Sequence, residues 1–283
     1  MRKVLSGIVA VLLTGTSGYA ADLYEPQVIE APAQEVAVVE TGGWYLRGDA
    51  GWSYNKMRGA HYFQGSNDTD VDFDTTRLKS GFVIGGGVGY QINDHFRTDV
   101  TLDYMFKSKF RGSTSSAGGA ASGVCVNPCT STDIASMTAL SLLANAYVDI
   151  GHYGIVTPYV GAGIGGTYVR WGDLKNTSCS TANPNTCDTE ETHGGKKSWR
   201  FTYALMAGAS VDLTCNLKAD VGYRFRHVTK GDMFGWKANG GPGYDKGFYS
   251  HEARAGLRYS FNGCETATYI PPADIPIEQP VYK

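Results

Sequence analysis

The sequence predicts an all-β protein, an eight-stranded antiparallel up-and-down transmembrane β-barrel with short periplasmic turns and four long extracellular loops. The first observation is a strict alternation in residues 217–226 and 252–261, where apolar and aromatic side chains take every second position and charged or small ones lie between them. A period of two gives each strand two different faces. In a membrane barrel, the apolar face meets lipid and the polar face lines the interior.

The second observation is the number and spacing of such segments. Three short connections, at 93–95, 151–155 and 214–216, alternate with long ones, as in outer-membrane barrels. A soluble eight-stranded barrel is the alternative, but its loops would have no reason to sort by length. The alternating segments lie at 44–54, 82–92, 96–106, 138–150, 158–171, 199–213, 217–226 and 252–261, and the long connections at 55–80, 111–136, 172–198 and 228–247.

The third observation is the N-terminal export signal. Residues 1–20 join a basic start to a short apolar run and small residues, which is typical of a secretory signal peptide cleaved before Ala21. No later stretch approaches the roughly 20 apolar residues of a membrane-spanning helix. We therefore expect a periplasmic tether over 21–42, the barrel over 43–263, and a Pro-rich periplasmic tail over 264–283, with both termini in the periplasm.

Three short motifs carry a resemblance to a known family. Residues 43–51 (GWYLRGDAG), 158–163 (PYVGAG) and 256–261 (GLRYSF) resemble the opacity-type proteins, the small "porin family" eight-stranded outer-membrane barrels of alphaproteobacteria. The resemblance implies the outer membrane of a Gram-negative bacterium, with membrane lipid, lipopolysaccharide and the barrel-assembly machinery as partners. Adhesion, haem binding, envelope integrity and pore formation are the roles proposed for such proteins.

Charged residues of both signs fall on the predicted inward face. Burying them requires pairing, because an unpaired buried charge costs several kcal/mol. We expect a structural ion-pair plug rather than a narrow ion path, since eight strands leave room only for side chains. The inward set is Arg47, Asp49, Arg97, Asp99, Asp103, Asp149, Arg200, Asp212, Lys218, Asp220, Arg224, Arg226, Glu252, Arg254 and Arg258.

Six cysteines enter an oxidising compartment, where disulfides form. Four lie in long loops and two on the periplasmic side, and a membrane band of about 25 Å separates the two groups. The predicted pairs are Cys125–Cys129, Cys179–Cys187 and Cys215–Cys264. The last pair predicts a register in which Asp220 faces Arg258, Arg226 faces Glu252 and His227 lies beside His251.

No catalytic, cofactor or metal site is expected. The six histidines lack metal-ligand spacing, and residues 161–166 (GAGIGG) match a dinucleotide-binding pattern without the helix that it requires. Small inward residues packed inside a narrow barrel explain this motif better. A net charge of −2 and a pI of about 6.3 give no sign of nucleic-acid binding. We therefore expect no enzymatic activity.

The expected function is a structural role in the envelope. The start Ala21-Asp22 resembles that of related barrels joined to peptidoglycan through the Ala α-amine, and an inert leader is an equally weighted alternative. A second alternative is an adhesin or a receptor for haem or a host factor acting through its loops, although the sequence identifies no ligand. A narrow-pore porin is the third. The candidate loop residues are Met233, Phe234, Trp236, Tyr244, Asp68, Asp70, Asp72 and Asp74.

Overall fold

The computed structural model describes residues 42–64, 69–116, 125, 128–237 and 240–264. The signal peptide, the segment that carries Ala21 and Asp22, and the Pro-rich tail all lie outside these residues. Among the described residues, no helix is long and apolar enough to cross a membrane.

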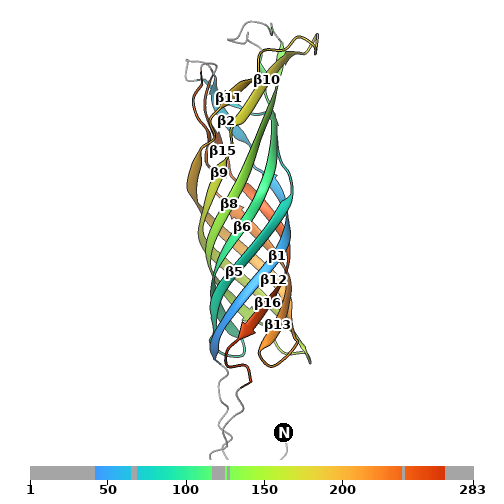
Figure 1. Cartoon of the computed structure of the whole chain (residues 1–283), viewed down its shortest axis with the longest axis vertical. Coiled ribbons are helices and arrows are strands. Elements are labelled where there is room, and N and C mark those ends of the chain that lie inside the picture. The colour runs from blue at the N-terminus through green and yellow to red at the C-terminus, as the bar shows by residue number, and fades with distance from the viewer. Residues whose placement is uncertain (1–41, 65–68, 117–124, 126–127, 238–239, 265–283) are drawn as a thin grey trace, which may run out of the picture. The chain divides into compact units, whose positions relative to one another are not determined.

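Eight long strands form a closed antiparallel ring, which confirms the predicted fold (Figure 1). Each strand pairs with its neighbour in the chain, and the first strand pairs with the last to close the ring. The ring has no exposed edge strand, because each of its strands pairs with a neighbour on both sides. In chain order, the strands are β1 (Gly43–Met57), β5 (Gly81–Gln91), β6 (Phe96–Ser113), β8 (Cys129–Asp149), β9 (Val156–Trp171), β12 (Lys197–Asp212), β13 (Leu217–Val228) and β16 (Phe248–Ser260).

The register of the ring determines how strongly the strands tilt. A path that follows paired residues from Leu46 once around the ring returns to β1 at Lys56. This offset of ten residues is the shear of the barrel. Strand number and shear together set the width, and eight strands enclose a space just wide enough for side chains to fill.

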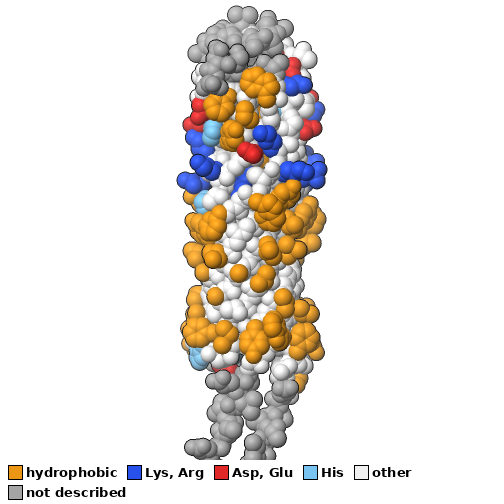
Figure 2. Space-filling view, turned by 90° about the vertical axis from the view of Figure 1, so that its left-hand side faces the viewer, with side chains coloured by type: hydrophobic (Ala, Val, Ile, Leu, Met, Phe, Trp, Pro, Cys, Tyr) orange, Lys and Arg blue, Asp and Glu red, His pale blue; other side chains and the backbone are white. Residues whose placement is uncertain are grey.

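The outer wall carries an apolar band with aromatic residues at both margins (Figure 2). Trp44 and Tyr90 stack edge to face near the end with the short turns, which we call the turn end. Trp52 and Phe82 do the same towards the opposite end, which we call the loop end. Trp44 is 59% exposed and Trp52 55% exposed, which suits lipid contact and would be costly in water.

Beyond the aromatic residues of the loop end, the two faces of the wall exchange character. At the end of β1, Lys56 and the following Arg58 are exposed and Met57 points inward, whereas lower on the same strand Trp52 points outward and Ser53 inward. A β-bulge in β6 between Met105 and Ser108 accompanies the change on that strand. Polar side chains on the outside and apolar side chains on the inside are the pattern of a sheet in water. The exchange of the two faces therefore marks the edge of the lipid band.

The long connections contain further strands rather than loose loops. A separate four-stranded sheet has the order β14 (Gly231–Phe234), β15 (Gly240–Asp245), β2 (Ala60–Gln64) and β3 (Thr69–Asp72). Gly247 turns β15 into β16 at φ +90°, where a Cβ would lie 2.5 Å from the Val228 carbonyl oxygen. The remaining elements extend the barrel wall: β4 (Thr75–Leu78), β7 (Ser115–Ser116), β10 (Leu174–Ser180) and β11 (Glu191–His193).

Two details of the sequence-based strand assignment are wrong. β8 begins at Cys129 and β6 continues to Ser113, so much of the expected loop 111–136 is strand. The register of β13 and β16 is also shifted by two residues, because Asp220 lies opposite Gly256, and Lys218 opposite Arg258. The prediction counted ladder steps back from the disulfide at Cys264, but residues 261–264 form a turn that has left the ladder.

Candidate functional site

A network of ion pairs fills the part of the barrel inside the lipid band. It joins six arginines to six carboxylates, so its formal charge is zero, and we call it the lumen network. Arg254 is its centre, because it contacts Asp49, Asp103 at 2.5 Å and Glu252 at 3.0 Å. The members are Arg47, Arg97, Arg224, Arg226, Arg254 and Arg258 with Asp49, Asp99, Asp103, Asp149, Asp220 and Glu252.

The two pairs singled out by the sequence are present, but they run diagonally across the sheet. Arg258 lies 3.3 Å from Asp220, and Arg226 contacts Glu252. The long arginine side chains span the shift of two residues in the register. His227 instead faces Tyr249, and His251 faces Phe225, so the expected histidine pair does not form. Asp212 and Lys218 pair with each other at the half-exposed turn end, at 2.9 Å.

Aromatic rings complete the filling towards the turn end. The guanidinium of Arg97 lies between two rings, 4.3 Å from the centroid of Tyr147 and 4.6 Å from that of Tyr159. Glycines on the wall make room for these rings. A Cβ at Gly161 would lie 2.5 Å from the ring of Tyr147, and one at Gly163 would lie 2.1 Å from the Asn145 side chain. The glycine motif at 161–166 is thus a packing device, as the sequence indicated.

Little space remains in the lumen network. A cavity between Arg47, Tyr147, Tyr159 and Arg224 has a volume of about 20 Å³. That is room for about one water molecule. A wider polar hollow of about 200 Å³ opens at the turn end, beside Gln91, and does not extend past Arg258.

Above the lumen network, the interior becomes an apolar core, which we call the mouth core. It joins inward side chains of the wall to side chains of the long connections, for example Phe110 and Trp171, whose ring centroids are 5.6 Å apart, and Phe73, 6.1 Å from Phe110. Its buried members are Met57, Ala60, Phe73, Leu78, Val83, Met105, Phe110, Ala135, Met137, Ala139, Val169, Trp171, Leu174, Val228, Met233, Phe234 and Phe248.

Sequence reasoning missed the mouth core. It assigned Met233 and Phe234 to an exposed loop, but each is only 1% exposed. The signal was present in the strands that leave the membrane, since Lys109 and Arg111 point outward and Phe110 between them points inward. Charged residues at alternate positions after an aromatic margin indicate a wall in water with an apolar interior.

A buried carboxylate fastens the hairpin of β14 and β15 to the wall. Asp245 accepts hydrogen bonds from Arg200 Nη1 at 2.7 Å, from Trp171 Nε1 at 3.1 Å and from the Gly247 amide at 3.0 Å. Arg200 also donates to the Asp232 carbonyl at 2.8 Å. Two wall strands, β9 and β12, thus hold one loop hairpin by three hydrogen bonds, and the Gly247 amide adds a fourth bond to Asp245 from within the connection.

A histidine joins two of the long connections. His193 in β11 packs edge to face on Phe234 of β14, with centroids 5.1 Å apart, and its Nδ1 lies 3.3 Å from the Gly235 carbonyl oxygen. Burial lowers the pKa of His193 below its usual value, because a charged ring would lose its hydration there. The neutral ring, which donates to Gly235, is the stable form.

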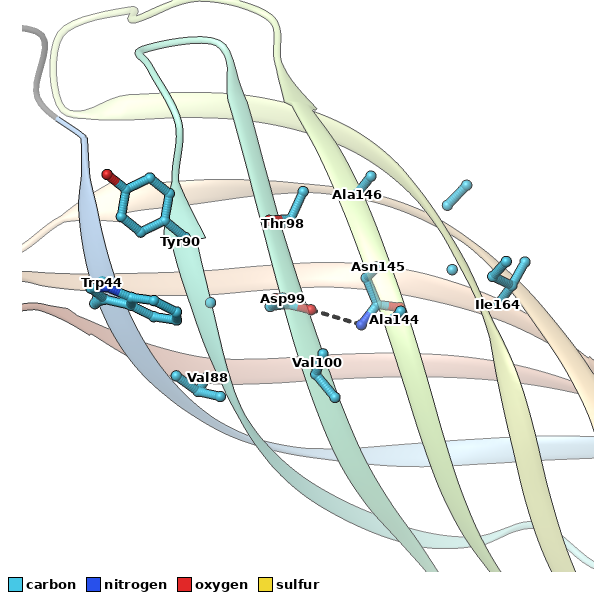
Figure 3. Close-up of a pocket in the computed structure, with 13 residues that line it drawn as sticks. Trp44, Val88, Tyr90, Thr98, Asp99, Val100, Ala144, Asn145, Ala146 and Ile164 are labelled. Atoms are coloured by element: carbon cyan, nitrogen blue, oxygen red, sulfur yellow. Dashed lines mark hydrogen bonds between the residues drawn. The ribbon is translucent and has the colours of Figure 1, made fainter.

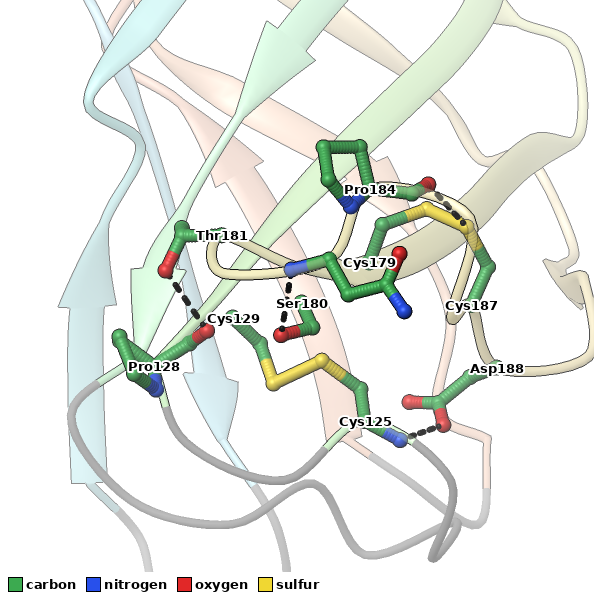
Figure 4. Close-up of a disulfide and its surroundings, with 10 residues drawn as sticks. Cys125, Pro128, Cys129, Cys179, Ser180, Thr181, Pro184, Cys187 and Asp188 are labelled. Atoms are coloured by element: carbon green, nitrogen blue, oxygen red, sulfur yellow. Dashed lines mark hydrogen bonds between the residues drawn. A yellow bond between two sulfur atoms is a disulfide. The ribbon is translucent and has the colours of Figure 1, made fainter.

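All six cysteines form the three disulfides that the sequence predicts: Cys125–Cys129, Cys179–Cys187 and Cys215–Cys264. Figure 4 shows the first two side by side at the loop end.

Three hydrogen bonds join the segments that these two disulfides close, one of them from the Thr181 amide to the Pro128 carbonyl at 3.0 Å. The Cys125 amide donates to Asp188 at 2.7 Å, and the Thr181 hydroxyl donates to the Pro128 carbonyl at 3.0 Å. The connections that follow β6 and β9 therefore form one stapled unit.

The four-stranded sheet presents an aromatic surface on its outer side. His61 stacks on Tyr244 at 5.4 Å, and Phe63 meets the same ring edge to face at 6.4 Å. Trp236 is 54% exposed in the neighbouring connection. We call the sheet, its connections and the stapled unit the loop cap.

The acidic run beside this surface forms no metal site among the described residues. Asp70 and Asp72 lie on the exposed edge strand β3, and Asp72 pairs with Lys246 at 2.7 Å. Asp68 lies outside the described residues.

A groove of about 680 Å³ runs along the outer wall of β1, β5, β6, β8 and β9 (Figure 3). Trp44 and Ile164 flank it, and small side chains such as Ala144 and Ala146 form its floor. The Asp99 to Asn145 hydrogen bond in the same view, 2.7 Å long, lies behind this floor and belongs to the lumen network. The groove lies within the apolar band, so lipid chains are the matching contents.

Comparison with known proteins agrees with this architecture. The family model "Outer membrane protein beta-barrel domain" matches residues 28–261. A relative from Brucella abortus (strain 2308), described as an uncharacterized protein, is 36% identical over 89% of this chain and 98% of its own length. A protein of Rickettsia bellii (strain RML369-C) with the printed name "Putative adhesin" is 31% identical over 76% of this chain and 87% of its own.

Solved structures with a similar course of the chain include two small barrels. Neisserial surface protein A is 19% identical, with a TM-score of 0.37 over 78% of this chain and 100% of its own. OprG from Pseudomonas aeruginosa is 12% identical, with a TM-score of 0.44 over 78% of this chain and 97% of its own. With the family model matched from residue 28 to residue 261, the chain belongs to the outer-membrane protein β-barrel family of Gram-negative bacteria.

Proposed function

We propose that the protein is a sealed structural barrel of the outer membrane that presents its loop cap at the cell surface as a binding platform. In this orientation, the turn end and both termini face the periplasm. The observation that carries the proposal is the double filling of the interior, by the lumen network and by the mouth core. A barrel filled in two layers serves to hold something in the membrane rather than to pass a solute.

The order within the loop cap supports a binding role. Its hairpins share a buried core, two disulfides and the Asp245 hydrogen bonds, so its outer surface is fixed before any partner arrives. A preformed surface binds with less loss of conformational entropy than flexible loops do. The half-buried rings of Phe63 and Tyr244 and the exposed ring of Trp236 are the best candidate contacts, because aromatic residues are enriched at interfaces. The name of the Rickettsia relatives agrees with this class of function.

The platform is tested with whole cells that carry changes on the cap surface. We expect Phe63→Ser combined with Tyr244→Ser and Trp236→Ser to reduce attachment to host cells or matrix without lowering the amount of folded protein. Tyr153→Ser is the matched control, since Tyr153 is 67% exposed at the turn end. Unchanged attachment with the triple variant, or equal loss with the control, contradicts the platform.

Anchorage to peptidoglycan through Ala21 and Asp22 is a separate part of the structural role. The α-amine of a mature Ala21 is a suitable nucleophile, because its pKa of about 7.7–8.0 leaves more of it neutral than of any lysine. Sacculi boiled in detergent and digested with lysozyme should release the protein with a muropeptide on Ala21. Complete extraction by hot detergent before digestion contradicts the anchor but leaves the platform intact.

We also propose that the protein has no enzymatic activity. Each buried carboxylate of the lumen network is held by an arginine and is therefore poorly placed to act as a general base.

A further inference from the structure

On the face shown in Figure 2, lysine and arginine side chains lie directly above the apolar margin of the loop end, and the exposed positions on other strands extend them into a ring. On β1, Lys56 follows Tyr54 by two residues, and on β9, Arg170 follows Tyr168 by two. We call this ring the basic belt. Its members point outward from most of the wall strands and their extensions: Lys56, Arg58, Arg77, Lys79, Lys107, Lys109, Arg111, Arg170, Lys197, Lys230 and Lys246.

The basic belt occurs at one end of the barrel only. The outward-facing lysines and arginines that the structure describes all lie towards the loop end, whereas Lys218 at the turn end faces the lumen and pairs with Asp212 at 2.9 Å. A charge placed merely for solubility would have no reason to favour one end. The asymmetry therefore points to a partner that exists on one side of the membrane.

Members of the basic belt also face each other across the strands. Arg77 lies opposite Arg111, and Arg170 lies opposite Lys197. The Lys79 amide donates to the Lys109 carbonyl at 2.8 Å, which makes those two lysines neighbours as well. Like charges directly opposite each other destabilise a sheet.

The chain itself supplies few anions at this level. Within the described residues, the ion pairs include one belt member, Lys246, with Asp72 at 2.7 Å. Asp74 precedes the β4 strand and lies beyond Arg77 on the side away from the membrane, and Asp173 accepts a hydrogen bond from the Gly195 amide at 3.0 Å. Within the described part of the chain, none of the three opposed cation pairs has an ion pair with a carboxylate, so an anion from outside is the matching counter-charge.

We propose that the basic belt binds the phosphate groups of lipopolysaccharide in the outer leaflet. The belt lies where the acyl chains end, so the anions at its depth are those of a lipid headgroup. Phosphate oxygens accept several charge-assisted hydrogen bonds from arginine and lysine and can bridge two opposed cations. Lipid A carries such phosphates, and it occupies the leaflet that faces the loop cap in the proposed orientation. This contact fixes the depth and the sidedness of the barrel.

The inference rests on the orientation of the barrel in the proposed function, but not on the binding platform. The attachment test changes residues on the outer surface of the loop cap, whereas the residues of the basic belt lie on the wall below the cap. Either proposal therefore stands if the other fails.

The test compares three double variants that each remove two positive charges. Arg77→Gln/Arg111→Gln and Arg170→Gln/Lys197→Gln each break an opposed pair of the basic belt. Lys175→Gln/Lys237→Gln is the matched control, because both lysines are exposed in the loop cap outside the belt. The full mature chain is folded in a zwitterionic detergent at low ionic strength, where charges about 10 Å apart are not yet screened. Its thermal unfolding midpoint is read from the heat-dependent gel shift of the barrel.

Each protein is measured alone, with bisphosphorylated lipid A, with the same lipid A after removal of its phosphates, and with phosphatidylglycerol. We expect the order of the unfolding midpoints of the wild-type protein and the belt variants to reverse when bisphosphorylated lipid A is added. In detergent alone, both belt variants unfold at or above the wild-type temperature, because repulsion has been removed. With bisphosphorylated lipid A, the wild-type protein and the control gain several degrees, the belt variants gain less than half as much, and dephosphorylated lipid A has little effect on any of them.

Three results overturn the proposal. The first is an equal gain of the wild-type protein with dephosphorylated lipid A, which means that the acyl chains alone act. The second is a loss of the lipid A response in the control as large as in the belt variants. The third is an equal gain of the wild-type protein with phosphatidylglycerol, which makes the belt a general anion-binding surface rather than a lipopolysaccharide site.

Discussion

At the scale of single residues, the choice of arginine for every cation of the lumen network follows from geometry. A guanidinium has five N–H donors in a fixed plane, whereas an ammonium is a point charge. Arg254 uses this plane to contact three carboxylates from three strands. A lysine could not join Asp49, Asp103 and Glu252 in this way. The narrow lumen thus remains neutral and filled with few side chains.

Asp103 is the carboxylate whose loss should cost the most. It is fully buried and pairs with Arg224 at 2.6 Å and Arg254 at 2.5 Å. We expect Asp103→Asn to lower the free energy of unfolding by about 3–5 kcal/mol, the usual effect of removing one partner of a buried ion pair. Urea unfolding in lipid vesicles measures it. Asp70→Asn, on the exposed strand β3, is the control and should stay within about 0.5 kcal/mol. A loss of similar size in both variants contradicts the network.

The inward glycines provide a second test at this scale. A Cβ at Gly89 would lie 2.3 Å from the Tyr45 ring and 2.5 Å from the Thr98 carbonyl oxygen. Overpacking of this kind costs about 1–3 kcal/mol, so Gly89→Ala should unfold at lower urea than the wild-type protein. Gly48→Ala is the matched control, since a Cβ there meets nothing within 4 Å. An unaffected Gly89→Ala variant means that the ring moves aside freely.

At the scale of elements, the hairpin of β14 and β15 depends on Asp245. An asparagine at this position keeps the shape of the side chain but lacks the negative charge of the carboxylate, which accepts hydrogen bonds from Arg200, Trp171 and the Gly247 amide. We expect Asp245→Asn to increase amide hydrogen exchange in both strands of the hairpin, while the membrane-spanning strands remain protected, since local opening can occur without global unfolding. Asp232→Asn in the same hairpin is the control, because Arg200 contacts only its carbonyl. Equal exchange in the two variants contradicts the role of the carboxylate.

The contact between β11 and β14 should depend on pH. Because the pKa of His193 is lowered by burial, the folded cap favours the neutral ring. The stability of this contact is therefore present at neutral pH and is lost as the pH falls through the lowered pKa. Amide protection factors of residues 233–235 should fall between about pH 7 and pH 5, the range in which histidine titrates. His193→Gln, which cannot gain a proton there, should show no such fall. A fall of equal size in that variant assigns the effect to another group.

At the scale of the whole molecule, the part inside the membrane could be predicted almost completely from the sequence. Alternation of lipid-facing and inward residues specifies eight strands, and small residues at 161–166 indicate close internal packing. The part outside the membrane could not be predicted from the sequence. There, alternation continues with the faces exchanged, and the pairing of β2 with β15 joins residues 176 to 185 positions apart in the sequence. Pairing between distant segments leaves no local pattern, so the mouth core appears only in three dimensions.

The lumen network shows the same limit at smaller scale. The sequence identifies which residues face inward, because parity alone decides it. The sequence does not give the partner of each inward residue. When one strand is shifted by two residues against its neighbour, the same residues still face inward, but Asp220 then lies opposite Gly256 instead of Arg258. The diagonal reach of arginine then restores the pairs that the wrong register had suggested.

A conductance measurement tests the sealed barrel as a whole. An ion would have to pass the stack of Tyr147, Arg97 and Tyr159, a cavity of about 20 Å³, and then the mouth core. The cavity holds about one water molecule, so no hydrated ion fits without displacement of side chains. We expect the mature protein in planar bilayers to give no conductance steps above background over a range of voltages.

Removing one layer of the filling should leave the barrel closed, because the other layer remains. The expected result for Tyr147→Ala/Tyr159→Ala, which widens the turn end, is therefore still no steady current, since the mouth core of Phe110, Trp171 and Phe234 is untouched. A large porin inserted in the same bilayer checks the recording. Reproducible steps from the wild-type protein contradict the sealed barrel. Steps from the double variant alone show instead that the mouth core does not close the pore, and that the rings of Tyr147 and Tyr159 are the seal.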